Sequence, residues 1–265
     1  FRQRLLMTLI LIPAVIALIF YAPSIVFAGF LLCLLIGMSH EWQQFFQLQL
    51  ANEVWFKTLL IVFGTILVFL GFPFFLYLDL AFWIVALVVI TAYPKFKECW
   101  TNAGFIAANA WILLGVSLAI LYHWQGDEDG RIQLLAVMAL VWAADIGAYL
   151  VGRKWGKHKM IPLVSPGKSW EGLIGGIFSV GLVAWLEIYL IDPFSPIHWF
   201  VVSLVTGFFS VFGDLWISLL KRQVGLKDTG SIIPGHGGLL DRLDSLLAAI
   251  PIFYFGIVVL GDLTA

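Results

Sequence analysis

The sequence has little charge and little cysteine. Asp, Glu, Lys and Arg make up 12% of its 265 residues, whereas ordinary soluble domains have roughly 25%. Apolar residues reach 62%, and a soluble fold of this length could not hide so much hydrocarbon from water. Two Cys exclude a disulfide-stapled scaffold, and Gly without a triplet period excludes collagen. The composition therefore predicts an integral membrane protein.

An excess of charge of one sign is also missing. Fifteen Lys and Arg against sixteen Asp and Glu give a net charge of −1, so we expect no nucleic-acid partner. No small-residue cleavage site follows the first apolar stretch, which we therefore expect to be a retained helix rather than a signal peptide.

Long apolar runs predict an all-α, polytopic membrane fold with about nine transmembrane helices, since each crossing needs about 20 apolar residues. The first five helices, in residues 1–130, are expected to form a scaffold. The last four, in residues 131–265, are expected to carry the polar chemistry, and both parts to form one folding unit. The expected helices span residues 4–20, 23–38, 54–71, 74–92, 103–123, 131–151, 171–191, 197–220 and 243–262.

The basic residues fall on one side of this arrangement. With nine spans, every Lys and Arg lies on the side of the N-terminus except Arg131. The positive-inside rule then places the N-terminus in the cytoplasm and the C-terminus outside. Residues 39–54 alternate polar and aromatic side chains, which we interpret as an interfacial stretch on the cytoplasmic face.

A first polar stretch follows the sixth apolar run. Asp145 and Tyr149 are one helical turn apart and share a face. Gly172 and Gly176 form a small-xxx-small pair that predicts close helix packing. Five basic residues, which could simply contact anionic lipid headgroups, lie between these positions: Arg153, Lys154, Lys157, His158 and Lys159.

Residues 165–172 contain Gly-Lys-Ser but do not form a P-loop. Pro162 stands where that pattern needs Gly, and an all-helical chain offers no preceding strand. A turn that opens a helix could still present Ser165, Lys168 and Ser169 to a phosphate. Ser169 as a simple helix N-cap is the alternative.

A second polar stretch surrounds Asp214, inside the predicted eighth span. Ser218, Lys221 and Arg222 follow on the same helical face. An ionised carboxylate in a membrane span costs several kcal/mol unless it is partnered. Asp214 is therefore a candidate functional residue, the alternative being a buried ion pair with Lys221 or Arg222.

A glycine-rich loop and two further carboxylates come next. Gly237 and Gly238 allow the main chain to approach a ligand and direct N–H groups at it. Asp241 and Asp244 are three residues apart on one helical face. Together with Asp214 they suit Mg²⁺, which prefers one or two carboxylates plus water and phosphate oxygens. The five His are too scattered to favour zinc.

The run from Ser218 to Asp244 resembles the signature of the phosphatidate cytidylyltransferases, or CDP-diacylglycerol synthases. It reads Ser-x2-Lys-Arg-x4-Lys-Asp-x-Gly-x2-Ile-Pro-x-His-Gly-Gly-x2-Asp-Arg-x-Asp. Two upstream segments, Asp-x2-Ala-Tyr-x2-Gly from Asp145 and Ser-Pro-x-Lys-Ser-x-Glu-Gly from Ser165, resemble other motifs of that family. The resemblance covers the C-terminal half, because residues 1–130 match only as hydrophobic spans.

This resemblance implies a nucleotidyltransferase of phospholipid biosynthesis that converts CTP and phosphatidic acid into CDP-diacylglycerol and pyrophosphate. We expect the reaction at the cytoplasmic face of a bacterial-type inner membrane, with Mg²⁺ and possible use of a second cation. Asp214 and Asp241 would hold the metal, with Asp244 and Asp145 as additional carboxylates.

The remaining expected site residues contact phosphate or nucleotide. His236 would orient a phosphate or act on a proton. The residues expected to bind and neutralise the substrates are Ser165, Lys168, Ser169, Ser218, Lys221, Arg222, Lys227, Asp228, Gly237, Gly238 and Arg242.

Two other functions stay open on the sequence. One is a CTP-dependent polyprenol or phytol kinase, and the other is a transporter that uses Asp145 and Asp214 as an ion pathway. A CDP-alcohol phosphotransferase is excluded because its Asp-x2-Asp-Gly-x2-Ala-Arg run is absent. The Gly-rich helix at residues 171–191 could pack within one chain or between two chains of a homodimer.

Overall fold

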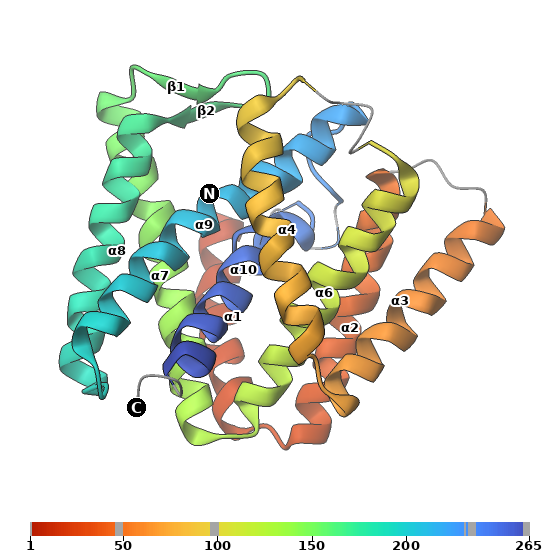
Figure 1. Ribbon diagram of the computed structural model, residues 1–265, viewed down its shortest axis with the longest axis horizontal. Coiled ribbons are helices and arrows are strands. Elements are labelled where there is room, and N and C mark those ends of the chain that lie inside the picture. Colours follow the sequence, from red (N-terminus) through yellow and green to blue (C-terminus); the bar gives the residue numbers. More distant parts are fainter. Residues whose placement is uncertain (1, 46–49, 96–100, 231, 233–236, 262–265) are drawn as a thin grey trace.

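The structure, a computed structural model, describes residues 2–45, 50–95, 101–230, 232 and 237–261. A helix is present at each of the nine predicted ranges (Figure 1). The last helix continues into a π-helical segment, Phe255–Leu260, and a short 3-10 turn, Gln43–Phe45, follows the second. The helices are α1 (Arg2–Tyr21), α2 (Ser24–Trp42), α3 (Leu50–Leu70), α4 (Pro73–Ala92), α6 (Ala103–Gln125), α7 (Glu128–Trp155), α8 (Trp170–Ile191), α9 (Pro196–Gln223) and α10 (Leu240–Tyr254).

Seven of these helices are long and apolar enough to cross a membrane: α2, α4, α6, α7, α8, α9 and α10. Within the described residues, α1 and α3 contribute shorter apolar stretches, Leu11–Tyr21 and Val54–Leu70. The count of nine spans therefore stays a prediction for those two helices. The outer face of α8 carries exposed Phe178, Leu182 and Trp185, as expected of a surface in contact with lipid.

The expectation of an entirely helical chain is wrong at one place. Strands β1 (Lys159–Ile161) and β2 (Ser165–Ser169) form an antiparallel hairpin between α7 and α8. Ser-Pro-Gly in β2 disfavours helix, because Pro lacks an N–H and Gly loses more backbone entropy than other residues. The segment that we expected to be a helix-opening turn is thus a short strand, and the fold is nearly all-α.

The hairpin is held at the end of the closely packed pair α7 and α8. A Cβ added at Gly172 or Gly176 would lie 3.0 Å from the carbonyl oxygen of Ala148 or 2.8 Å from that of Ala144, respectively. The two glycines therefore let α8 lie directly on the backbone of α7, which confirms the predicted packing role. This contact fixes where the hairpin begins and ends.

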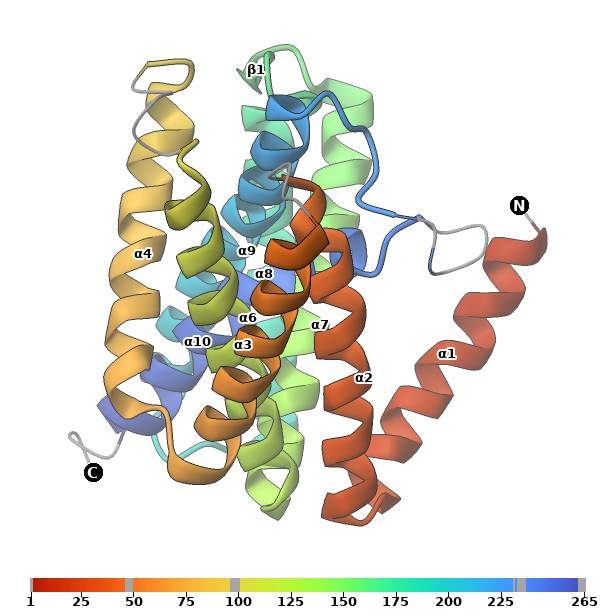
Figure 2. The same cartoon turned by 90° about the vertical axis from the view of Figure 1, so that its right-hand side faces the viewer.

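The ends of the helices alternate between the two faces of the bundle. The C-terminal ends of α2, α4, α7 and α9 lie toward the same end as the hairpin, at the top of Figures 1 and 2. Arg131 lies near the start of α7, at the other end, where its Nε donates to the Gln125 carbonyl oxygen at 2.8 Å. The predicted separation of Arg131 from the basic hairpin residues is therefore confirmed.

Helix α10 begins deeper in the bundle than the place where α9 ends, as both views show. The first turn of α10 therefore lies beside the last turns of α9. The polar residues of both helices meet there.

Candidate active site

Asp214 of α9 is bound by a lysine from the hairpin. Its Oδ2 lies 2.7 Å from Nζ of Lys168, and its Oδ1 accepts a hydrogen bond from Oγ of Ser218 at 3.1 Å. Nζ of Lys168 also donates to the Val211 carbonyl oxygen at 3.1 Å. The predicted common face of Asp214 and Ser218 is confirmed, but the predicted alternative of an ion pair to Lys221 or Arg222 is wrong.

Asp241, in the first turn of α10, forms a second ion pair. Its Oδ1 lies 2.6 Å from Nζ of Lys221, and both side chains are about nine-tenths buried. Its Oδ2 accepts from the backbone N–H groups of Thr229 at 2.8 Å and Gly238 at 3.3 Å. Three donors therefore surround this carboxylate, and one of them neutralises it.

Asp145 of α7 and Asp244 of α10 are electrostatic neighbours of the first pair. The charges of Lys168 and Asp214 act on both carboxylates. Asp145 is exposed, whereas Asp244 is buried and accepts from the N–H of Ser245 at 2.8 Å. Three helices thus direct carboxylates toward the hairpin lysine.

The carboxylates do not form the three-ligand cluster that we expected of Asp214, Asp241 and Asp244. Within the described part of the chain, no three His, Cys, Asp or Glu side chains lie close enough together to hold a metal. Mg²⁺ needs only one or two carboxylates when phosphate oxygens and waters complete its shell. The donor set around Asp214 therefore still fits this ion, with the substrate as the source of further oxygens.

A family model described as the cytidylyltransferase family matches residues 2–260. The chain belongs to the cytidylyltransferase family. It is 37% identical to a phosphatidate cytidylyltransferase of Haemophilus influenzae over 98% of this chain and 99% of the relative. It is 36% identical to one of Pseudomonas aeruginosa over 95% of each chain. The resemblance of the motifs is confirmed, and the protein is a nucleotidyltransferase.

Arg222 of this cytidylyltransferase, in α9, hydrogen-bonds both to the turn of the hairpin and to the loop that follows α9. Its Nε donates to the Val164 carbonyl oxygen at 3.2 Å, and its Nη1 to that of Leu226 at 3.3 Å. Lys227 and Asp228 follow with exposed side chains. Arg222 thus sets the positions of the hairpin turn and of the loop that carries Lys227. Its predicted contact with a phosphate stays a prediction.

Ser169 of the enzyme caps α8. Its Oγ accepts from the N–H of Gly172 at 3.1 Å, and the residue is 3% exposed. This confirms the N-cap interpretation. Ser165 is partly buried in β2, so Lys168 is the residue of this segment whose side chain reaches the site.

The rest of the predicted set divides by location. Gly237 lies beside Asp241 and has a φ of +87°. Only a residue without Cβ adopts this backbone angle without strain. Arg242 is exposed on the first turn of α10. His236 lies outside the described residues.

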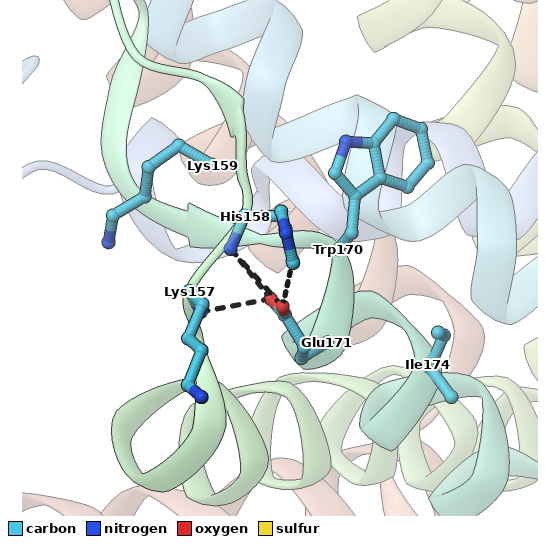
Figure 3. Close-up of a pocket in the computed structure, with 6 residues that line it drawn as sticks. All are labelled: Lys157, His158, Lys159, Trp170, Glu171 and Ile174. Atoms are coloured by element: carbon cyan, nitrogen blue, oxygen red, sulfur yellow. Dashed lines mark hydrogen bonds and ion pairs between the residues drawn. The ribbon is translucent and has the colours of Figure 1, made fainter.

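The base of the hairpin forms an open pocket of about 710 Å³ (Figure 3). Glu171 accepts from the N–H groups of Lys157 and His158 at 3.2 Å and pairs with Nδ1 of His158 at 2.6 Å. The amino groups of Lys157 and Lys159 point away from this carboxylate. Glu171 therefore closes the hairpin, and the two lysines are left facing outward.

Sequence reasoning missed a buried carboxylate that contacts the loop before α10 of the cytidylyltransferase. Glu41, near the end of α2, is fully buried. It accepts hydrogen bonds from Oγ1 of Thr229 at 2.8 Å and from the N–H groups of Leu239 at 2.8 Å and Leu240 at 2.7 Å. Nε2 of Gln44 donates to the Thr229 carbonyl oxygen at 2.8 Å.

The interpretation of residues 39–54 as interfacial is therefore wrong for Glu41 and for Trp42, whose Nε1 donates to the Ile106 carbonyl oxygen at 3.1 Å. The helical spacing of buried residues in α2 does indicate that positions 41 and 42 are buried. Leu31, Leu35 and Met38 are buried in α2, and the same spacing continues to positions 41 and 42.

Proposed function

We propose that the enzyme transfers the cytidylyl group of CTP to phosphatidic acid, forming CDP-diacylglycerol and pyrophosphate. The observation that carries the proposal is the Lys168–Asp214 pair, which joins the hairpin to α9 at the end of an apolar bundle. A site of this kind suits a water-soluble nucleotide and a lipid whose acyl chains stay in the bilayer. The names of the relatives support these substrates. By the positive-inside rule, this end faces the cytoplasm of a bacterial inner membrane.

In the proposed reaction, a phosphate oxygen of the lipid attacks the α-phosphorus of CTP. The bond from that phosphorus to the oxygen bridging to the β-phosphorus breaks, and pyrophosphate leaves with the electron pair. Both reactants are anions, so cations must screen them and stabilise the leaving group. Lys168 and Lys221 at the carboxylates, and exposed Lys227 and Arg242 beside them, supply that charge. A phosphate nucleophile needs no strong base.

Asp214 is our assigned Mg²⁺ ligand, with Asp145 and Asp244 as neighbouring carboxylates. Bound Mg²⁺ would neutralise phosphate charge and polarise the reacting phosphorus. The hard oxygen donors of these residues fit that ion. We give Asp241 a positioning role, because its side chain is only 9% exposed and its oxygens accept from Lys221 and from two backbone N–H groups. The Asp214 side chain is 31% exposed, and among the described residues its Oδ1 accepts only from the hydroxyl of Ser218.

The test is pyrophosphate release from CTP by purified protein in mixed micelles, with and without phosphatidic acid and Mg²⁺. We expect release only when both are present. Asp214→Asn should lower the rate at least about 100-fold while the protein stays folded, whereas Asp192→Asn, at the opposite end of the bundle, should not.

Pyrophosphate release that does not depend on phosphatidic acid would refute the proposed reaction. The formation of a phosphorylated prenol with CDP as the co-product would refute it as well. Wild-type activity of Asp214→Asn would refute the metal assignment alone. Asp192 is a matched control because it is exposed and has a φ of 51°, a left-handed conformation that Asn also tolerates.

A further inference from the structure

Helix α10 has no cap of its own. Leu239, which precedes it, has no side-chain acceptor for the free N–H groups of the first turn. Glu41 supplies one from α2, almost 200 residues earlier in the chain, by accepting from the N–H groups of Leu239 and Leu240. A carboxylate at this position also complements the positive end of the helix dipole. The orientation of the first turn of α10 therefore depends on a residue of the N-terminal half.

Thr229 connects this cap to the candidate active site. Its hydroxyl donates to Glu41, its backbone N–H donates to Asp241, and its carbonyl oxygen accepts from Gln44. Asp241 in turn holds Lys221. A continuous series of hydrogen bonds therefore joins Glu41 to the buried ion pair, through the residue that directly follows exposed Lys227 and Asp228.

The loop is also fitted sterically around the Glu41 carboxylate. A Cβ added at Gly230 would lie 2.5 Å from Oε1 of Glu41, and one at Gly238 would lie 2.7 Å from Oε2. The two glycines of the signature therefore leave the space that this side chain occupies. Both the hydrogen bonds and the packing of the loop thus depend on a carboxylate at position 41.

We propose that Glu41 is a positioning residue for cytidylyl transfer, which acts by fixing Thr229 and the first turn of α10. The inference rests on the proposed function for its catalytic part. Glu41 is fully buried and its oxygens accept from Thr229, Leu239 and Leu240, so its role is indirect. It holds the carboxylate of Asp241 and the loop with Lys227 in the geometry that the reaction uses, and residues 1–130 thereby contribute to catalysis as well as to the scaffold.

Thr229→Val tests this with the smallest change, because it keeps the shape of the side chain and removes the donor to Glu41. We expect kcat to fall about 10- to 100-fold, as for other groups that orient a reactive residue. The KM values for CTP and phosphatidic acid should change less. Thr229→Ser restores the hydroxyl and should recover most of kcat.

Glu41→Gln should lower kcat to a similar extent, and the double variant with Thr229→Val should be scarcely worse, because both changes break the same bond. Glu187→Gln is the matched control. Glu187 is also buried, with its Oε2 accepting from Nε1 of Trp199 at 3.1 Å. It lies about 25 Å along α8 from the hairpin end, and its variant should keep wild-type kcat.

Wild-type kcat in Thr229→Val and Glu41→Gln would overturn the inference, as would a Thr229→Ser variant as impaired as Thr229→Val. Hydrogen exchange gives a readout that needs no reaction. The amides of residues 226–230 and 237–241 should exchange faster in Glu41→Gln than in wild type, and unchanged exchange would overturn the positioning role. An inactive wild type would instead refute the proposed function, and the exchange result would still decide whether Glu41 orders the loop.

Discussion

Gly213 sets the distance between the two helices that carry the site, so Gly213→Ala should impair the reaction strongly. It precedes Asp214 in α9 and lies against α10. A Cβ at this position would overlap the carbonyl oxygen of Asp244 and lie 3.1 Å from Cα of Ser245 and from Cβ of Ala248. Carbon atoms pack best at about 3.5–4.0 Å. The substitution therefore forces α9 and α10 apart by roughly 0.5–1 Å.

The expected loss follows from that displacement. A shift of about 1 Å at reacting groups costs on the order of 100-fold in rate, which is about 2.7 kcal/mol of activation free energy. The free energy of unfolding should fall by about 1–3 kcal/mol, as for other overpacked sites. The protein should therefore remain folded at assay temperature while its kcat falls.

Initial rates of pyrophosphate release at saturating CTP and phosphatidic acid, with thermal unfolding of the same samples, measure both effects. Gly181→Ala in α8 is the control, because its Cβ would have its nearest neighbours at 3.7 Å, an ordinary contact. Wild-type kcat in Gly213→Ala would show that the spacing of α9 and α10 at Asp214 and Asp244 does not matter, and would refute the assignment of the site to this contact.

Three further outcomes follow from the contacts. Lys168→Met removes a charge-assisted bond worth about 1.5–3 kcal/mol and should raise the KM for CTP roughly 10- to 100-fold. Lys159→Met, at the exposed first position of strand β1, should leave this KM unchanged. Equal KM values for the two variants would remove Lys168 from the site. Arg222→Gln should release the hairpin from α9, so trypsin should cleave after Lys157 or Lys159 faster than in wild type. An unchanged cleavage rate would contradict the proposed role of Arg222 in holding the hairpin. Chelation of divalent cations should stop product formation and added Mg²⁺ should restore it, while activity that persists in the chelator would exclude the metal.

The parts of the fold that follow from local sequence could be predicted. The nine helical ranges depend on apolar runs and their Pro and Gly boundaries, and the structure has a helix at each. The close packing at Gly172 and Gly176 depends on spacing within one helix. Asp214 stood out because a charged residue inside an apolar run is itself an anomaly.

Partners that are distant in sequence could not be predicted in the same way. Lys168 pairs with Asp214 across 46 positions of sequence, through a hairpin too short and too rich in Pro and Gly to be recognised as strands. Glu41 lies 188 residues from Thr229. Its polar neighbours resemble an interfacial segment, and only the tertiary fold turns the carboxylate toward α10.

The cap on α10 has a consequence for biogenesis. During membrane insertion, α2 is in place before residues 229–240 have been synthesised. Glu41 therefore lacks its three hydrogen-bond donors, Thr229, Leu239 and Leu240, at that stage. A carboxylate in that position is costly in the bilayer, which favours keeping the end of α2 hydrated or the acid protonated until α10 is inserted. The insertion of α10 would then both complete the reactive centre and satisfy this carboxylate, so that catalytic competence and the loss of a destabilising group are reached in the same event.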